Sequence, residues 1–288
     1  MIAKETYYNN QLIFSNLKEF CEPVKATGFS IKYVVNGTEV YTLNNEQHIV
    51  KNNQYLLSNI EKEGVVEIES KQFVKGICIS IDRNLMKQVV DYILQPDSNC
   101  VEEDVTNFFT TSNFLDSHYN DVDTKVGGLL KGLPFNETNG FSCQHNEARA
   151  DFFYKLAEAI VQDQMPVFKQ LHNIPSIKYS TKKDLYKRIQ KAKELIDSSF
   201  ENDLNINNIA TYSCMSEYHF YRLFKQVQGI SPMQYIIKKR LENAKYLIAQ
   251  QQMPISEVAL HTGFTDVFSF SKMFKKHFQM SPSSLLKK

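Results

Sequence analysis

The sequence of 288 residues predicts two domains: an N-terminal antiparallel β-barrel of the jelly-roll type with flanking helices, then an all-α domain with two helix-turn-helix motifs. Three observations indicate this multidomain fold class. The length exceeds that of an ordinary single domain. Apolar residues alternate in the first third of the chain and later recur at helical spacing. Charge differs between the two parts, and the hydrophobic content of 42% excludes disordered and collagen-like classes.

The formal net charge of +1 conceals opposite charges in the two parts of the chain. Residues 176–288 contain 18 Lys and Arg against 9 Asp and Glu, which gives +9, whereas residues 1–175 contain 15 against 23, which gives −8. A basic segment attached to an acidic one is typical of a unit that binds nucleic acid or a membrane surface. Chance segregation of charge along a long chain is the alternative.

The cysteine and hydropathy patterns predict a cytoplasmic protein with no membrane partner. No apolar run approaches the roughly 18 residues of a membrane span, and the first ten residues lack the apolar stretch of a signal peptide. The five cysteines include no CxxC pair, so they form neither a plausible disulfide framework nor a zinc cluster. We therefore expect a reducing compartment.

The first third of the chain has the pattern of short strands. Residues 29–35 alternate in polarity, Asn36 and Gly37 supply the residues of a type I′ turn, and residues 38–43 continue the pattern, which predicts a β-hairpin. Further apolar runs occur at 48–50, 55–58, 65–69 and 73–81, separated by turn-rich segments. Many short strands at about ten-residue spacing favour an antiparallel barrel or jelly roll.

Helical spacing begins after residue 81. It predicts helices over 83–94, near 101–110 and 122–131, and from 146 to about 164. The last of these offers a face for a homodimer or for packing against the barrel, and both alternatives stay open. The polar, proline-containing stretch at 174–181 predicts the boundary between domains 1–175 and 176–288.

An internal repeat is the most informative feature of the basic domain. The segment 209–232 aligns with 258–282, so that Phe220, Phe224 and Pro232 match Phe270, Phe274 and Pro282. Each copy predicts a helix-turn-helix unit, at about 206–229 and 255–279, joined by a helix at 232–249. That helix of 18 residues would be about 27 Å long at 1.5 Å per residue, against the roughly 34 Å between major grooves on one face of DNA. It could therefore place two recognition helices in successive grooves.

The second helix of each unit has an apolar face and an outward face rich in aromatic and basic residues. In the first copy, Phe220, Leu223, Phe224 and Val227 are predicted to point inward, and in the second copy Phe270, Met273 and Phe274. The outward residues are Tyr218, Tyr221, Arg222 and Lys225 in the first copy, and Phe268, Ser271, Lys272 and Lys275 in the second. Such groups suit base edges and phosphates. An ordinary solvated helix face is the alternative for a single helix.

At these residues the chain resembles the AraC/XylS family of bacterial transcription regulators. The resemblance covers residues 184–288 and includes R-L-x-x-A-K-x-L-I from Arg240, G-F-x-D from Gly263, and F-K-K-x-F from Phe274. It implies an activator or repressor whose partners are promoter DNA and RNA polymerase. It also implies base contacts from Tyr218, Tyr221, Arg222, Phe268, Ser269, Ser271 and Lys272. Gln279 departs from the family, which usually has glycine there, so we expect a less regular helix end.

The N-terminal part resembles the cupin-like sensor domain common in that family. The resemblance implies a small-molecule effector, with an apolar pocket inside the barrel. The candidate wall residues are aromatic: Tyr33, Tyr41, Tyr55 and Phe73. Two alternatives stay open: these rings fill the core, or the domain serves only protein interaction or dimerisation.

The sequence also allows an enzyme, either a metal-dependent cupin or a DNA-repair alkyltransferase with a similar DNA-binding unit. A metal-binding cupin needs a close His/His/Glu cluster, and His48 stands alone among the predicted strands. The repair enzyme needs four cysteines near the N-terminus, and Cys21 alone precedes Cys78. We therefore predict a regulator without catalytic residues, metal or cofactor.

Overall fold

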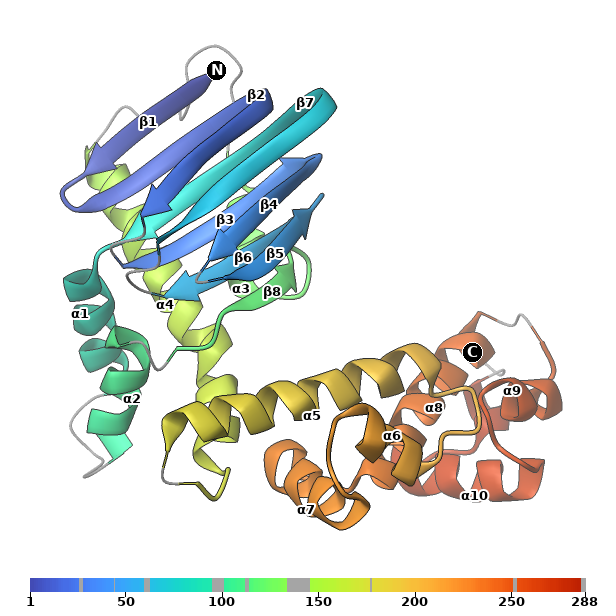
Figure 1. Cartoon of the computed structure of the whole chain (residues 1–288). Helices are drawn as coiled ribbons and strands as arrows, with labels where there is room; N and C mark the ends of the chain where they lie inside the picture. Colours follow the sequence, from blue (N-terminus) through green and yellow to red (C-terminus); the bar gives the residue numbers. More distant parts are fainter. Residues whose placement is uncertain are drawn as a thin grey trace. The chain divides into compact units, whose positions relative to one another are not determined.

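Strands dominate the first third of the chain and helices the remainder, and the computed structural model divides into two units, Met1–Phe168 and Lys169–Lys288 (Figure 1). The structure describes residues 1–25, 28–43, 45–59, 63–94, 101–111, 114–133, 146–176, 178–250 and 253–285. The division falls within helix α4 (Asn146–His172), a little before the polar stretch where the sequence predicts the boundary. Two domains of the predicted classes, one rich in antiparallel strands and one helical, are thus confirmed.

The N-terminal unit is built on an antiparallel sheet of eight strands in its described residues, with the order β1-β2-β7-β3-β6-β8. Strand β4 pairs with β5 and with β7. The long β7 lies at the centre, because β2, β3 and β4 all pair with it. The strand bounds are β1 Ile2–Tyr7, β2 Asn10–Lys25, β3 Phe29–Asn36, β4 Thr38–Leu43, β5 Glu46–Lys51, β6 Gln54–Asn59, β7 Glu63–Ile81 and β8 Ser117–Asn120.

The predicted hairpin between residues 29–35 and 38–43 is wrong, although both strands exist. Strand β3 pairs with the second half of β7, from Lys75 to Ile81, and β4 pairs with its first half, from Gly64 to Glu67. Gly37 has φ +97°, and a Cβ there would lie 2.8 Å from the Val74 side chain. The Asn36–Gly37 turn therefore redirects the chain along β7 instead of folding β4 back on β3.

The sheet does not close into the predicted barrel. Closure would require its end strands to pair, but among the described residues β1 pairs only with β2 and β8 only with β6. Strand β5 likewise pairs only with β4. The result is a twisted open sheet that buries both faces of β3, where six consecutive residues from Phe29 to Val34 are buried.

Helices cover one face of this sheet (Figure 1). Tyr33, Tyr55 and Tyr119 are neighbours in register across β3, β6 and β8 on that face. The Tyr119 hydroxyl donates to Gln164 Oε1 of α4 at 3.2 Å, and Phe29 packs edge-on against Phe114 with ring centroids 4.9 Å apart. The helices of the unit are α1 Arg83–Leu94, α2 Val101–Thr110, α3 Lys125–Lys131 and α4.

The other face combines an apolar cluster with buried polar groups. Val34, Leu43, Val50, Leu56 and Val66 pack around Tyr41. Beside them, Lys32 Nζ lies 3.0 Å from Cys78 Sγ, and the Tyr41 hydroxyl donates to the carboxylate of Glu39. Lys32 and Glu39 are each only 3% exposed. The interior between these strands is therefore occupied by protein side chains.

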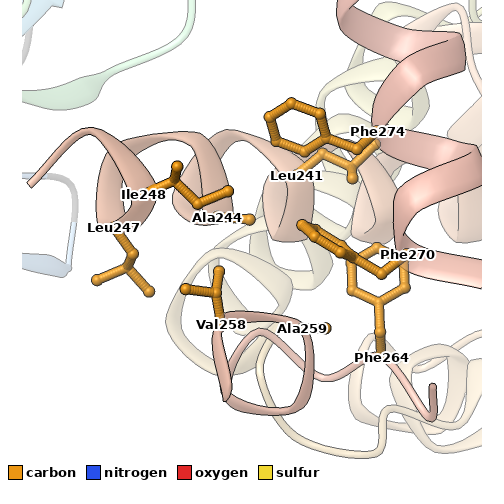
Figure 2. Packing of buried hydrophobic residues seen from close by; sticks show 9 residues of the cluster. All are labelled: Leu241, Ala244, Leu247, Ile248, Val258, Ala259, Phe264, Phe270 and Phe274. Atoms are coloured by element: carbon orange, nitrogen blue, oxygen red, sulfur yellow. The ribbon is translucent and has the colours of Figure 1, made fainter. Parts of the chain in front are cut away.

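The C-terminal unit contains six α-helices in its described part after α4, with α8 between the two helix-turn-helix units. Tyr235 of α8 packs edge-on against Phe224, and Leu241 and Ala244 of α8 pack with Phe270 and Phe274 (Figure 2). No helix among the described residues is long and apolar enough to span a membrane. The helix bounds are α5 Tyr179–Ser199, α6 Ile206–Tyr212, α7 Glu217–Gln228, α8 Pro232–Ala249, α9 Ile255–His261 and α10 Val267–Phe278.

Candidate nucleic-acid interface

The helix pairs α6–α7 and α9–α10 form the two predicted helix-turn-helix units, and side-chain caps fix where their helices begin. The Asn205 side chain accepts from the Asn207 N–H at the start of α6, and Asp266 accepts from the Ser269 N–H at 2.7 Å at the start of α10. Hydrogen bonds from the backbone and side chain of Ser269, with a smaller effect of the Thr265 hydroxyl, lower the pKa of Asp266, so its capping carboxylate stays ionised. Ser216 occupies the same position before α7 without a side-chain cap bond.

Each unit contains two residues in the left-handed region, one in its turn and one after its second helix. In the turns these are Cys214 (φ +55°) and Gly263 (φ +86°), and after the helices Gly229 (φ +76°) and Gln279 (φ +57°). Each copy therefore has glycine at only one of its two left-handed positions. Gln279 adopts the capping conformation that Gly229 adopts, and its N–H donates to Lys275 O at 2.9 Å. The less regular helix end expected there is therefore not found.

The outward face of α7 is exposed as the sequence predicts. Tyr218 is 77% and Tyr221 45% exposed, and Arg222 and Lys225 are exposed beside them. The opposite face is buried, since Phe220, Leu223, Phe224 and Val227 are at most 3% exposed. The helix therefore presents two phenol rings, a guanidinium and an ammonium group on one solvent-facing surface.

The corresponding surface of α10 contains Phe268, 79% exposed, with Lys272 and Lys275 also exposed. Ser269 and Ser271 lie at its edge and are half-buried. The inward prediction is confirmed for the fully buried Phe270 and Phe274 and is wrong for Met273, which is 38% exposed. Phe278, one turn beyond Phe274, continues the inward stripe and packs partly buried against the core.

The cationic groups of both surfaces are available for a ligand. Arg222, Lys225, Lys272 and Lys275 make no side-chain hydrogen bond or ion pair with any residue that the structure describes. Elsewhere in the same unit, by contrast, Lys193 and Lys239 pair with Asp197. Unpaired cations beside exposed aromatic rings are the groups that contact phosphates and bases.

Helix α8 is anchored to its neighbours by polar contacts as well as by its core. The Tyr235 hydroxyl donates to Asp197 of α5 at 2.9 Å, and burial together with that carboxylate raises the pKa of Tyr235, so it remains a neutral donor. The helix begins with a capping box, in which the Ser231 and Gln234 side chains each accept the other's backbone N–H. The range Pro232–Ala249 is the one that the sequence predicts.

The candidate effector residues do not line one common cavity. Tyr33 and Tyr55 lie on the helix-covered face and Tyr41 on the opposite one, and each of the three is at most 4% exposed. Their hydroxyls are engaged: Tyr33 donates to Asp121 at 2.9 Å, and Tyr55 bonds Thr124 at 2.8 Å. These rings fill the interior, as the alternative interpretation expects.

Phe73 is 52% exposed, so its predicted inward position is wrong. Its ring lies beneath the Lys18 ammonium, 4.9 Å from the centroid. It lines an open groove of about 720 Å³ between loops of the sheet. The other groove residues are polar: Asn36, Gly37, Thr38, Lys51, Asn52, Gln54, Ser70, Lys71 and Gln72.

Sequence reasoning missed a pair of histidines. His48 of β5, which stands alone in the sequence pattern, lies beside His118 of β8, with His48 Nδ1 3.2 Å from His118 Nε2. No cluster of three or more His, Cys, Asp or Glu that could hold a metal occurs in the described part of the chain. The two histidines are 70 positions apart in the sequence, so no spacing motif reveals the pair.

Comparison with known proteins finds a helix-turn-helix family within the C-terminal unit and several regulators that match part of the chain. A family model described as a helix-turn-helix domain matches residues 209–288. The Msm operon regulatory protein of Streptococcus mutans is 30% identical over 134 residues, 46% of this chain and 45% of that protein. The arabinose operon regulatory protein of Escherichia coli is 32% identical over 114 residues, 39% of each. The matches thus span less than half of either regulator.

Among solved structures, an AraC-type transcriptional regulator from Chromobacterium violaceum is 29% identical, with a TM-score of 0.34. The aligned part covers 35% of this chain and 91% of that one.

Proposed function

We propose that the protein is a sequence-specific, double-stranded DNA-binding transcription regulator of the AraC/XylS type, since a helix-turn-helix family model matches its C-terminal unit and the relatives it matches are operon regulators. The observation that carries the proposal is the pair of exposed surfaces on α7 and α10, each at the same place in its copy of the repeat. Both carry aromatic rings and unpaired cations. Two similar surfaces joined by one connecting helix fit two contacts on one duplex.

We assign the exposed side chains of α7 and α10 to bases or to phosphates according to their chemical groups and their positions along the helix. Arg222 and its counterpart Lys272 lie near the middle of their helices, where a donor reaches guanine O6 and N7 in the major groove. Lys225 and Lys275 lie almost one turn further along, and we assign them to phosphates. Tyr218, Tyr221 and Phe268 supply apolar contact, with Phe268 suited to a thymine methyl group. Ser269 and Ser271 lie at the edge of the second surface and offer hydroxyl groups to bases or phosphates.

Selection of bound sites from random duplex DNA with the full chain tests the proposal. We expect one enriched sequence with two separated conserved segments, and binding that weakens steeply with salt as counterions are released. The double variant Arg222→Ala/Lys272→Ala should lose the enrichment. Lys238→Ala, on the exposed side of α8, removes one positive charge outside both surfaces, and it is the matched control for Arg222→Ala and Lys272→Ala tested singly. Failure of the full chain to bind any duplex at low salt would overturn the proposal.

We further propose that a small molecule controls this activity through the N-terminal unit. The groove beside Phe73 supports this, because its volume of about 720 Å³ accommodates a small organic ligand and its walls combine one ring with amides and ammonium groups. A thermal-shift screen of metabolites against the full chain, repeated with Phe73→Ala, tests the assignment. If the unit serves dimerisation alone, no metabolite will raise the melting temperature.

The remaining partners follow from this role. A transcription regulator works on promoter DNA alongside RNA polymerase, so we assign the protein to the bacterial cytoplasm with RNA polymerase as a partner. Homodimerisation through the N-terminal unit would supply a second pair of contacts on the operator. We assign no catalytic activity to either unit, since the named relatives are regulators of transcription.

A further inference from the structure

The strongest unassigned feature of the N-terminal unit is the contact between His48 and His118. The two imidazole rings come from different strands and lie nearly parallel, with an interplanar angle of 29° and centroids 5.4 Å apart. One nitrogen of each ring approaches the other, and the Nδ1···Nε2 distance is 3.2 Å. His118 is exposed and His48 is half-buried, so the pair lies at the edge of the unit, next to solvent.

This separation matches that of two ligands on one metal ion. Nitrogens that each lie 2.0–2.1 Å from an ion are about 2.9 Å apart at a right angle and about 3.4 Å apart at the tetrahedral angle. The observed 3.2 Å falls between these values. We propose that His48 and His118 bind one late first-row divalent ion, such as Cu²⁺, Ni²⁺ or Zn²⁺, as a bidentate imidazole site.

The ligand set defines which ions fit. Two imidazoles favour Cu²⁺, Ni²⁺ and Zn²⁺ over the oxygen-preferring Mg²⁺ and Ca²⁺, with Cu²⁺ binding most tightly. In the part of the chain that the structure describes, no third His, Cys, Asp or Glu completes a cluster with them. The two imidazoles are thus the protein ligands that the described residues supply.

The position of the pair gives the bound ion a structural consequence. His118 belongs to β8, which pairs only with β6, and His48 belongs to β5, which pairs only with β4 in the described residues. No backbone hydrogen bond joins β5 to β8 there. An ion held by both rings would connect these two edges of the open sheet. Since this geometry exists only in the folded state, the ion should stabilise the unit by mass action.

Titration of the chelator-treated full chain with CuCl₂ and with ZnCl₂ tests the site by calorimetry and thermal unfolding. We expect one ion per chain, a higher melting temperature, and a Cu²⁺ electron paramagnetic resonance spectrum with nitrogen couplings from two imidazoles. His48→Gln and His118→Gln should each raise the Kd for Cu²⁺ at least about tenfold, by loss of one ligand. His261→Gln, which removes an exposed histidine of α9, should leave the Kd unchanged.

Two results would overturn the proposal. One is the absence of any Cu²⁺-dependent rise in melting temperature of the native chain, which would leave the pair as a hydrogen bond between two rings. The other is an affinity for Cu²⁺ that persists in the double variant His48→Gln/His118→Gln, which would place the ion elsewhere. The spectrum of the native chain needs no substitution, so it decides the matter even if a variant folds poorly.

Discussion

The guanidinium of Arg240 donates to the carbonyl oxygen of Gly263 at 2.6 Å, and this bond ties the connecting helix α8 to the turn of the second helix-turn-helix unit. The same side chain donates to Phe200 O and to Asn202 O, both at 2.7 Å, in the segment between α5 and α6. One side chain thus joins three segments through their backbone. Rigid placement of α7 relative to α10 depends on this junction and on the core around α8.

Replacement of Arg240 should therefore damage both stability and DNA binding. We expect Arg240→Ala to cost about 2–4 kcal/mol in the unfolding of residues 169–288, since three charge-assisted hydrogen bonds are lost and their carbonyls lose partners. Arg240→Lys should recover only part of this, because an ammonium group lacks the planar fork that reaches all three oxygens. Urea unfolding measures the effect. An Arg240→Ala loss no larger than that of the exposed Lys238→Ala would contradict it.

The two left-handed glycines of the helix-turn-helix units, Gly229 and Gly263, should respond differently to alanine. Gly229→Ala should cost about 1 kcal/mol, the penalty of the left-handed conformation alone, because no atom lies within 4 Å of its added Cβ. Gly263→Ala should cost more, since its Cβ would lie 2.7 Å from Glu201 O and 2.8 Å from the Arg240 guanidinium carbon. Comparison of the two variants by urea unfolding separates conformational strain from steric contact. Equal losses of unfolding free energy in the two variants would contradict this, because they would show that Glu201 and Arg240 move away from the added Cβ at no cost in stability.

The helices of the C-terminal unit could be predicted because the patterns that specify each helix lie within its own stretch of sequence. The period of apolar residues, the caps and the repeat specify α7, α8 and α10 within the sequence that forms them, and the bounds of α8 agree with the predicted ones. Met273 is the exception, since its side chain is exposed although the sequence predicts it to point inward. Phe278, one turn beyond Phe274, is the next residue of α10 that packs against the core. Gln279 shows the converse, since the helix end forms without the glycine that the pattern favours.

The sheet was less predictable because strand pairing depends on residues far apart in the chain. The alternation of apolar residues identifies β3 and β4 as strands. Both pair with β7, which is long enough to accommodate them end to end, and they do not pair with each other. The effector candidates would share one pocket only inside a closed barrel, whereas the open sheet places Tyr33 and Tyr41 on opposite faces. Whether any of them binds an effector stays a prediction. The His48–His118 contact depends on the same long-range arrangement.

The buried carboxyl of Glu39 should make the N-terminal unit sensitive to pH. Burial raises the pKa of Glu39 above 4.5, although Tyr41, Lys32 and Ser15 each act to lower it. A raised pKa in the folded state means that folding favours the protonated form, so this contribution to stability is complete below about pH 4.5 and is lost as pH rises through the folded-state pKa. The melting temperature of Glu39→Gln should therefore fall less than that of the native chain between about pH 5 and pH 8.

The exposed carboxylate of Glu67 on β7 provides the control for this comparison. Glu67→Gln removes the same charge without touching the buried cluster, so its pH profile should follow that of the native chain. Parallel profiles for the native chain and Glu39→Gln would contradict the assignment. Both variants keep the size and shape of the side chain and make the same carboxyl-to-amide change, so a difference between their pH profiles reports the ionisation of the buried Glu39.

The last prediction concerns how α7 divides its contacts between bases and phosphates. Arg222→Ala should cost about 1–3 kcal/mol on the selected site and far less on scrambled DNA, because a bidentate contact to a base is lost. Lys225→Ala should weaken binding to both duplexes alike and reduce the slope of log Kd against log salt concentration by about one, because one phosphate contact is lost. Both side chains are exposed and unpaired in the described structure, so neither change disturbs the fold. Fluorescence anisotropy with the two duplexes at several salt concentrations measures all four affinities, and equal losses on both duplexes for both variants would remove the division of roles.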